Sequence, residues 1–127
     1  MRRVMILTAL IALSVAGAAA SASPSGEGAQ ASAVAKVSMG DNFFKPTKLR
    51  VKPKTKVTWT NDGGNPHTAT ADNDSFDTGT LSPGQSGSRT FKRLGKYSYF
   101  CEIHPSMRAT IKVCKKVNGR LVCRKRR

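Results

Sequence analysis

Three side chains with metal-binding chemistry follow one another at three-residue steps: Cys101, His104 and Met107. A thiolate, an imidazole and a thioether together suit copper, whereas they suit hard ions poorly. A trigonal copper site with one Cys, two His and a weak axial Met requires a second imidazole. The chain contains two histidines, and the other one is His67. We therefore predict that His67, Cys101, His104 and Met107 bind one copper ion, which alternates between Cu(II) and Cu(I).

Each of these side chains also has an ordinary structural explanation. An isolated Cys is often a small buried hydrophobe, and a Met at the start of a strand often fills a core. His104, beside Pro105, could be a plain loop residue. The combined Cys-x-x-His-x-x-Met spacing favours a metal site, whereas Cys-x-x-His alone would be weak evidence. The metal interpretation therefore depends on the whole set of four residues.

The two remaining cysteines, Cys114 and Cys123, flank an Asn118-Gly119 dipeptide. Asn-Gly is the strongest short signal for a β-hairpin. A two-residue turn there places the two cysteines opposite each other, with Cα atoms about 4.5–5.5 Å apart, a separation that a disulfide can bridge. We predict this disulfide, which leaves Cys101 free to bind metal. The alternative is two unbonded thiols in a loose tail.

Short strands separated by turns must position these ligands. Alternating apolar and polar residues predict strands over residues 34–39, 49–52, 56–61, 67–71, 86–92, 96–101 and 107–113, with a further short element over 76–81. The segment from Phe43 to Pro46 is predicted to be a turn or loop, because Pro46 disfavours helix before it. No sustained helical period follows the N-terminal region. We therefore predict an all-β sandwich.

The order of these motifs resembles that of the cupredoxins, and the plastocyanins and amicyanins in particular. The shared pattern is Phe44-x-Pro46, Val57-x-Trp59-x-Asn61, Pro66-His67, Pro83-Gly84 and Gly95-x-Tyr97-x-Tyr99-x-Cys101-x-x-His104-x-x-Met107, over about residues 34–113. The resemblance implies a Greek-key β-sandwich with copper at one end and one-electron transfer between larger redox proteins. Two positions depart from the family pattern: Lys54 replaces a frequent turn Gly, and Thr68 replaces an Asn that ties the ligand loops together in plastocyanins.

The chain divides into four predicted segments. Residues 1–22 have the basic start, apolar run and small-residue end of a secretory signal peptide, with an uncleaved anchor as the alternative. Residues 23–32 are predicted to be a flexible linker, residues 33–113 the cupredoxin domain, and residues 114–127 a disulfide-bridged hairpin with a basic tail. Export would place the protein in the periplasm or the extracellular cell envelope, where disulfides persist.

The chain is strongly basic, with a formal net charge of +15. This charge predicts redox partners with acidic surfaces and peripheral contact with an anionic envelope or membrane surface. Because the chain is predicted to be exported, nucleic acid is not an expected partner, and we expect a monomer. The final cations, Arg124 to Arg127, are either a solvated end or a docking element.

The predicted function is electron transport rather than an enzymatic reaction. His104 is expected to form the solvent-facing edge where electrons enter and leave, and the apolar residues Pro66, Pro105 and Met39 are predicted to form the docking patch. The alternative function is copper storage or delivery, although the chain lacks Met- and His-rich tracts. A multicopper enzyme would need more ligands than two histidines provide.

Overall fold

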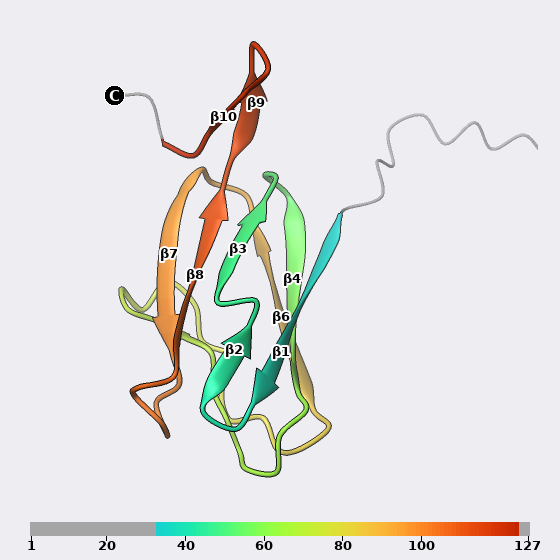
Figure 1. Ribbon diagram of the computed structural model, residues 1–127, viewed down its shortest axis with the longest axis vertical. Coiled ribbons are helices and arrows are strands. Elements are labelled where there is room, and N and C mark those ends of the chain that lie inside the picture. Colours follow the sequence, from blue (N-terminus) through green and yellow to red (C-terminus); the bar gives the residue numbers. More distant parts are fainter. Residues whose placement is uncertain (1–32, 125–127) are drawn as a thin grey trace, which may run out of the picture.

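The computed structural model describes residues 33–124, which form two packed β-sheets and a projecting hairpin (Figure 1). The strands are β1 (Val34–Gly40), β2 (Phe43–Lys45), β3 (Lys48–Val51), β4 (Thr55–Asn61), β5 (Thr70–Ala71), β6 (Ser86–Phe91), β7 (Gly95–Phe100), β8 (Arg108–Val113), β9 (Lys115–Val117) and β10 (Arg120–Val122). The all-β prediction is confirmed. Within residues 33–124 there is no helix able to cross a membrane. The predicted signal peptide and linker, residues 1–22 and 23–32, lie outside the described residues.

The strands of the sandwich are arranged so that several loops meet at one end. One sheet has the order β2-β1-β4-β6 and the other β3-β8-β7-β5. β1 pairs with β4 in parallel and β3 with β8 in parallel, while the other neighbours are antiparallel. In Figure 1, β1, β4 and β7 run towards the same end, and β3, β6 and β8 run away from it. The residues that follow β1, β4 and β7 therefore gather at that end, which we call the ligand end.

The core lies between the sheets and is built from alternate residues of the strands. Trp59 of β4 is fully buried, stacks on Phe76 with ring centroids 5.4 Å apart, and contacts Tyr99 edge-on at 5.7 Å. Such aromatic contacts add stability beyond the burial of their area. Met39 is also fully buried, because it faces inward two residues after Val37. The prediction that Met39 belongs to a surface docking patch is therefore wrong.

Two local predictions differ from the structure. Residues 43–45 form β2 rather than a loop, because Asn42 adopts a left-handed conformation (φ 70°) that reverses the chain and pairs Phe43 with Gly40. The predicted strand 67–71 is reduced to β5, and the element at 76–81 to isolated bridges that include His67 with Leu81. Side chains interrupt the ladder there: the Ala69 N–H donates to the Thr78 hydroxyl at 2.9 Å.

The C-terminal hairpin has the predicted register. Lys115, Lys116 and Val117 of β9 face Val122, Leu121 and Arg120 of β10, respectively. The predicted Cys114–Cys123 disulfide is confirmed. The two Cα atoms are 3.9 Å apart, closer than the separation expected for opposed residues. The Cys114 N–H donates to the Val51 carbonyl at 2.8 Å and so joins the hairpin to the sandwich.

Candidate metal centre

The predicted ligands come from two loops at the ligand end. His67 follows the turn-rich segment 62–66 after β4, and Cys101 follows β7 directly. The loop from Cys101 to Met107 closes on itself: the Cys101 N–H donates to the Met107 carbonyl at 3.0 Å, and the Met107 N–H donates to the His104 carbonyl at 2.8 Å. This closure holds the three predicted ligands of the loop in one compact turn.

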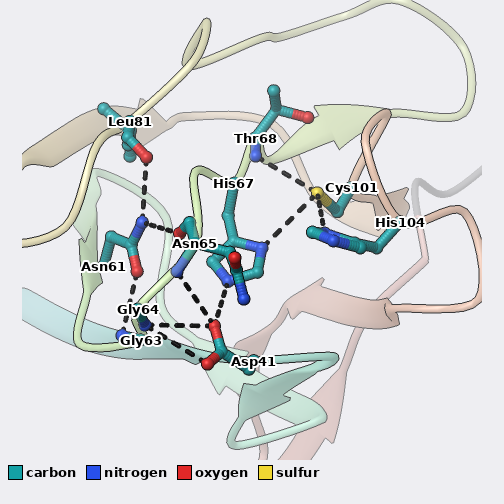
Figure 2. A network of polar contacts seen from close by, with 10 residues as sticks. All are labelled: Asp41, Asn61, Gly63, Gly64, Asn65, His67, Thr68, Leu81, Cys101 and His104. Atoms are coloured by element: carbon teal, nitrogen blue, oxygen red, sulfur yellow. Dashed lines mark hydrogen bonds and ion pairs between the residues drawn. The ribbon is translucent and has the colours of Figure 1, made fainter.

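The side chains of His67, Cys101 and His104 converge on one point. The Cys101 Sγ lies 3.8 Å from Nδ1 of His67 and 3.8 Å from Nδ1 of His104 (Figure 2). Two ligands in a trigonal plane, each about 2.0–2.3 Å from a shared ion as in comparable zinc sites, would be separated by nearly this distance. The three ligand atoms lie within 4.8 Å of one another. Their chemistry and spacing fit a copper ion.

The two imidazoles differ in exposure. His67 is 0% exposed, whereas His104 is partly exposed. Ile103 beside it is 45% exposed, and Pro105 is also exposed. Cys101 is fully buried and unpaired, and Met107 is buried at the end of the loop. Of the four predicted ligands, His104 is therefore the one whose side chain reaches solvent.

Asp41, in the turn between β1 and β2, fixes the orientation of the His67 ring. Its Oδ1 lies 3.2 Å from His67 Nε2 and accepts hydrogen bonds from the N–H groups of Gly64 (3.1 Å) and Asn65 (3.2 Å). The Gly64 amide, and then the His67 ring, lower the pKa of Asp41. The ionised carboxylate favours the tautomer with its proton on Nε2, which leaves the Nδ1 lone pair facing Cys101.

Sequence reasoning missed Asp41. It lies 26 residues before His67, and no motif links the two. The available signal was weak: an acidic residue directly follows a strand that ends beside the ligand loops.

Asn61, the last residue of β4, holds the loop before His67. Its side-chain amide donates to the carbonyls of Asn65 at 2.7 Å and Leu81 at 2.9 Å, and its Oδ1 accepts the Gly63 N–H at 2.9 Å. Asn61 is buried, so these bonds are shielded from competing water. The Asn of the Val-x-Trp-x-Asn motif thus has a structural role in placing His67.

Thr68 joins the two ligand loops. Its N–H lies 3.3 Å from the Cys101 Sγ, and its hydroxyl accepts the Glu102 N–H at 2.9 Å (the former contact is drawn in Figure 2). The first contact joins the backbone of the His67 loop to the Cys101 sulfur, and the second joins its side chain to the backbone of the Cys101 loop. The hydroxyl is held in turn by Thr70, 3.1 Å away. Thr68 therefore ties the two ligand loops together, as the Asn at this position does in plastocyanins.

Comparisons with known proteins agree with this geometry. Residues 31–114 match the model of the family described as copper binding proteins, plastocyanin/azurin family. Plastocyanin from Scenedesmus fuscus is 35% identical over an alignment of 83 residues, and the match covers 55% of this chain and 85% of that protein. Chloroplastic plastocyanin from Tetradesmus obliquus is 35% identical over an alignment of 72 residues, and the match covers 48% of this chain and 50% of that protein.

Solved structures show the same fold. A purple cupredoxin from Nitrosopumilus maritimus superposes with a TM-score of 0.60 at 27% identity, covering 62% of this chain and 98% of that one. A reduced single-site mutant of amicyanin gives 0.59 at 26% identity, over 65% and 83%. A copper-containing nitrite reductase from Thermus scotoductus gives 0.61 at 28% identity, but the match spans only 22% of that chain.

Proposed function

Because the chain belongs to the plastocyanin/azurin family of copper-binding proteins, with one copper ion as its cofactor, we propose that it carries single electrons between redox proteins. The observation that carries this proposal is the buried cluster of His67, Cys101 and His104, from which one imidazole alone reaches solvent. A shielded donor set with a single exposed edge suits a carrier that exchanges electrons without exchanging ligands.

We assign the roles of the ligands as follows. Cys101 would bind the ion as a thiolate, and His67 and His104 would bind it as neutral imidazoles through Nδ1. Met107, at the end of the closed loop, would supply its thioether as a further, weaker ligand. When bound, copper would supply a centre that accepts and releases one electron, and Met107 and the hydrogen bonds around the Cys101 sulfur would tune its potential.

The protein keeps the ligands still during this exchange. Asp41 orients His67, Asn61 holds the loop before it, and Thr68 links that loop to the residue after Cys101. Below the site, the packed aromatic core anchors β4 and β7. Ligands that are fixed by separate bonds change position little between the two oxidation states, so little reorganisation opposes electron transfer.

Partners are proposed to dock around His104. The exposed apolar residues Ile103, Pro105 and Pro66 lie in the ligand loops and would exclude water from a contact. Asp41, Asp62 and Glu102 also lie at this end, so the positive net charge acts on an acidic partner by long-range steering rather than at the contact itself. We propose that the protein acts as an exported monomer.

The family members described as plastocyanin and amicyanin support a carrier rather than an enzyme. The nitrite reductase resembles this chain over only a fifth of its own length. This chain holds two histidines, and both are used in the proposed site, so a second copper centre would lack imidazole ligands. The burial of His67 and Cys101 also argues against ready transfer of the metal to another protein.

The proposal is tested by protein-film voltammetry of the copper-loaded protein, combined with exposure to a Cu(I) chelator. We expect a reversible one-electron wave and retention of copper in both oxidation states. A protein that gives up its copper to the chelator within the time of one electron-transfer cycle would instead support copper storage or delivery.

A further inference from the structure

The end of the sandwich opposite the ligand end is uniformly cationic. Two turns, after β3 and after β6, and the β9–β10 hairpin extend from it. We call their exposed cations the cationic pole, which consists of Lys52, Lys54, Lys92, Arg93, Lys115, Lys116, Arg120 and Arg124. Within residues 33–124, none of these side chains forms an ion pair. The printed sequence adds three more cations after Arg124.

Within the described residues, no acidic side chain lies in the two turns or the hairpin that form this pole. Asp41, Asp62 and Glu102 lie in the loops of the ligand end, and the other described carboxylates, Asp72, Asp74 and Asp77, lie in the connection between β5 and β6. Like charges gathered without counter-charges repel one another, which opposes folding. The uncompensated positive potential is therefore the property that sets this end of the molecule apart.

The hairpin presents its charges in a rigid, outward form. Figure 1 shows β9 and β10 extending beyond the two sheets. An isolated two-stranded hairpin is only marginally stable, and here the Cys114–Cys123 disulfide closes it. Leu121 is 50% exposed and lies opposite Lys116. An exposed apolar side chain among cations is the pattern of a surface that meets both the headgroups and the acyl boundary of a membrane.

We propose that the cationic pole binds an anionic lipid membrane and so holds the protein with its ligand end facing away from the lipid. β8 runs from the ligand end to the hairpin, and the extended chain from Met107 through β8 to Val113 spans about 20 Å. This length places the edge of His104 on the solution side, where a soluble partner can reach it. The inference goes beyond electron transfer and does not depend on it, since lipid binding needs no copper.

An acidic redox protein is the less suitable occupant of this pole. A partner seated on the hairpin would lie the length of β8 away from the proposed ligands, whereas the exposed edge of His104 lies at the other end. An anionic membrane surface, by contrast, can meet the projecting hairpin directly, while the cations of the two turns behind it add to the attraction over a distance. The charge therefore serves attachment at one end, while the other end stays open for exchange.

The test is sedimentation of the full mature protein with vesicles of phosphatidylglycerol and phosphatidylcholine in equal parts, with pure phosphatidylcholine for comparison. We expect binding to the anionic vesicles only, weakened about tenfold when salt rises from 0.1 M to 0.5 M, because screening shortens the reach of the charges. The copper-free protein and the Cys101→Ala variant should bind equally well. This separates a failure of the inference from a failure of the proposed function.

Two matched variants locate the surface. The hairpin variant carries Lys115→Glu, Lys116→Glu, Arg120→Glu and Arg124→Glu; the control carries the same change of charge at exposed strand positions, as Lys36→Glu, Lys45→Glu, Lys48→Glu and Arg89→Glu. The hairpin variant should lose vesicle binding, and the control should keep most of it. Circular dichroism establishes that both variants are folded. Equal loss in both would overturn the inference, because it would reduce the effect to net charge.

A third variant, Leu121→Ser, distinguishes a membrane from a soluble polyanion. We expect it to weaken vesicle binding several-fold while leaving binding to polyglutamate unchanged. Polyglutamate binding as tight as vesicle binding, with no effect of Leu121→Ser on either, would assign the pole to an acidic polymer and contradict the membrane proposal.

Discussion

Removal of the Asp41 carboxylate should weaken copper binding without unfolding the protein. Partners that orient a metal-bound His through its second nitrogen typically contribute 10- to 100-fold in metal affinity. The side chain of Asp41 is 46% exposed, so water screens its contact with His67. The carboxylate is nevertheless fixed by two amides, those of Gly64 and Asn65. We therefore expect a loss near the lower limit, about tenfold, for Asp41→Ala.

The assay is competition for Cu(II) against a chelator of known affinity, at neutral pH. Asp41→Asn keeps an oxygen that can accept from Nε2 and should lose less affinity than Asp41→Ala. The matched control is Asp62→Asn, because Asp62 is a nearby exposed carboxylate that contacts Ser38 and no predicted ligand. Unchanged affinity in Asp41→Ala, or an equal loss in Asp62→Asn, would refute the role assigned to Asp41.

Three further predictions concern the scaffold. Burial raises the pKa of Tyr99 from 10.0 to about 12. As pH rises, the unfolded chain therefore loses the Tyr99 proton before the folded protein does. About 2–3 kcal/mol of the free energy of unfolding present below pH 10 should disappear as pH rises towards 12. Urea unfolding of Tyr99→Phe should show a smaller decrease over the same pH range. Thr68→Val leaves the Glu102 N–H without its acceptor and should lower the free energy of unfolding of the copper-free protein by about 1–2 kcal/mol, again measured in urea. Lys54 has a φ of 69°, a backbone conformation that favours glycine. Lys54→Gly should therefore stabilise the protein by about 0.5–1 kcal/mol, measured by thermal unfolding. A lower melting temperature in this variant would contradict the prediction.

Features that depend on local sequence were predictable. The Asn118-Gly119 turn determines which residues face each other across the hairpin, and the Cys114–Cys123 disulfide follows from that register. Alternation identified the long strands, because one face of each must be buried. The convergence of His67 with Cys101 and His104 could be expected because the chain offers no other histidine as a partner.

Features that depend on contacts between distant segments were not predictable. Asp41 reaches His67 only because β1 and β4 are parallel neighbours that end together. Met39 was assigned to the surface because the sequence near a strand end does not show which alternate face is buried. The connection made by Thr68 required the actual positions of two loops, since a hydroxyl can replace an amide only at the right distance.

The central claim is that Cys101 binds copper as a thiolate together with His67 and His104. Its most direct test is the visible spectrum of the purified mature protein during titration with Cu(II), for the natural chain and for Cys101→Ala. We predict an intense copper–thiolate charge-transfer band that saturates at one copper per protein and is absent from Cys101→Ala. A protein that stays colourless with Cu(II), or a band that survives in Cys101→Ala, would contradict the assignment of this site.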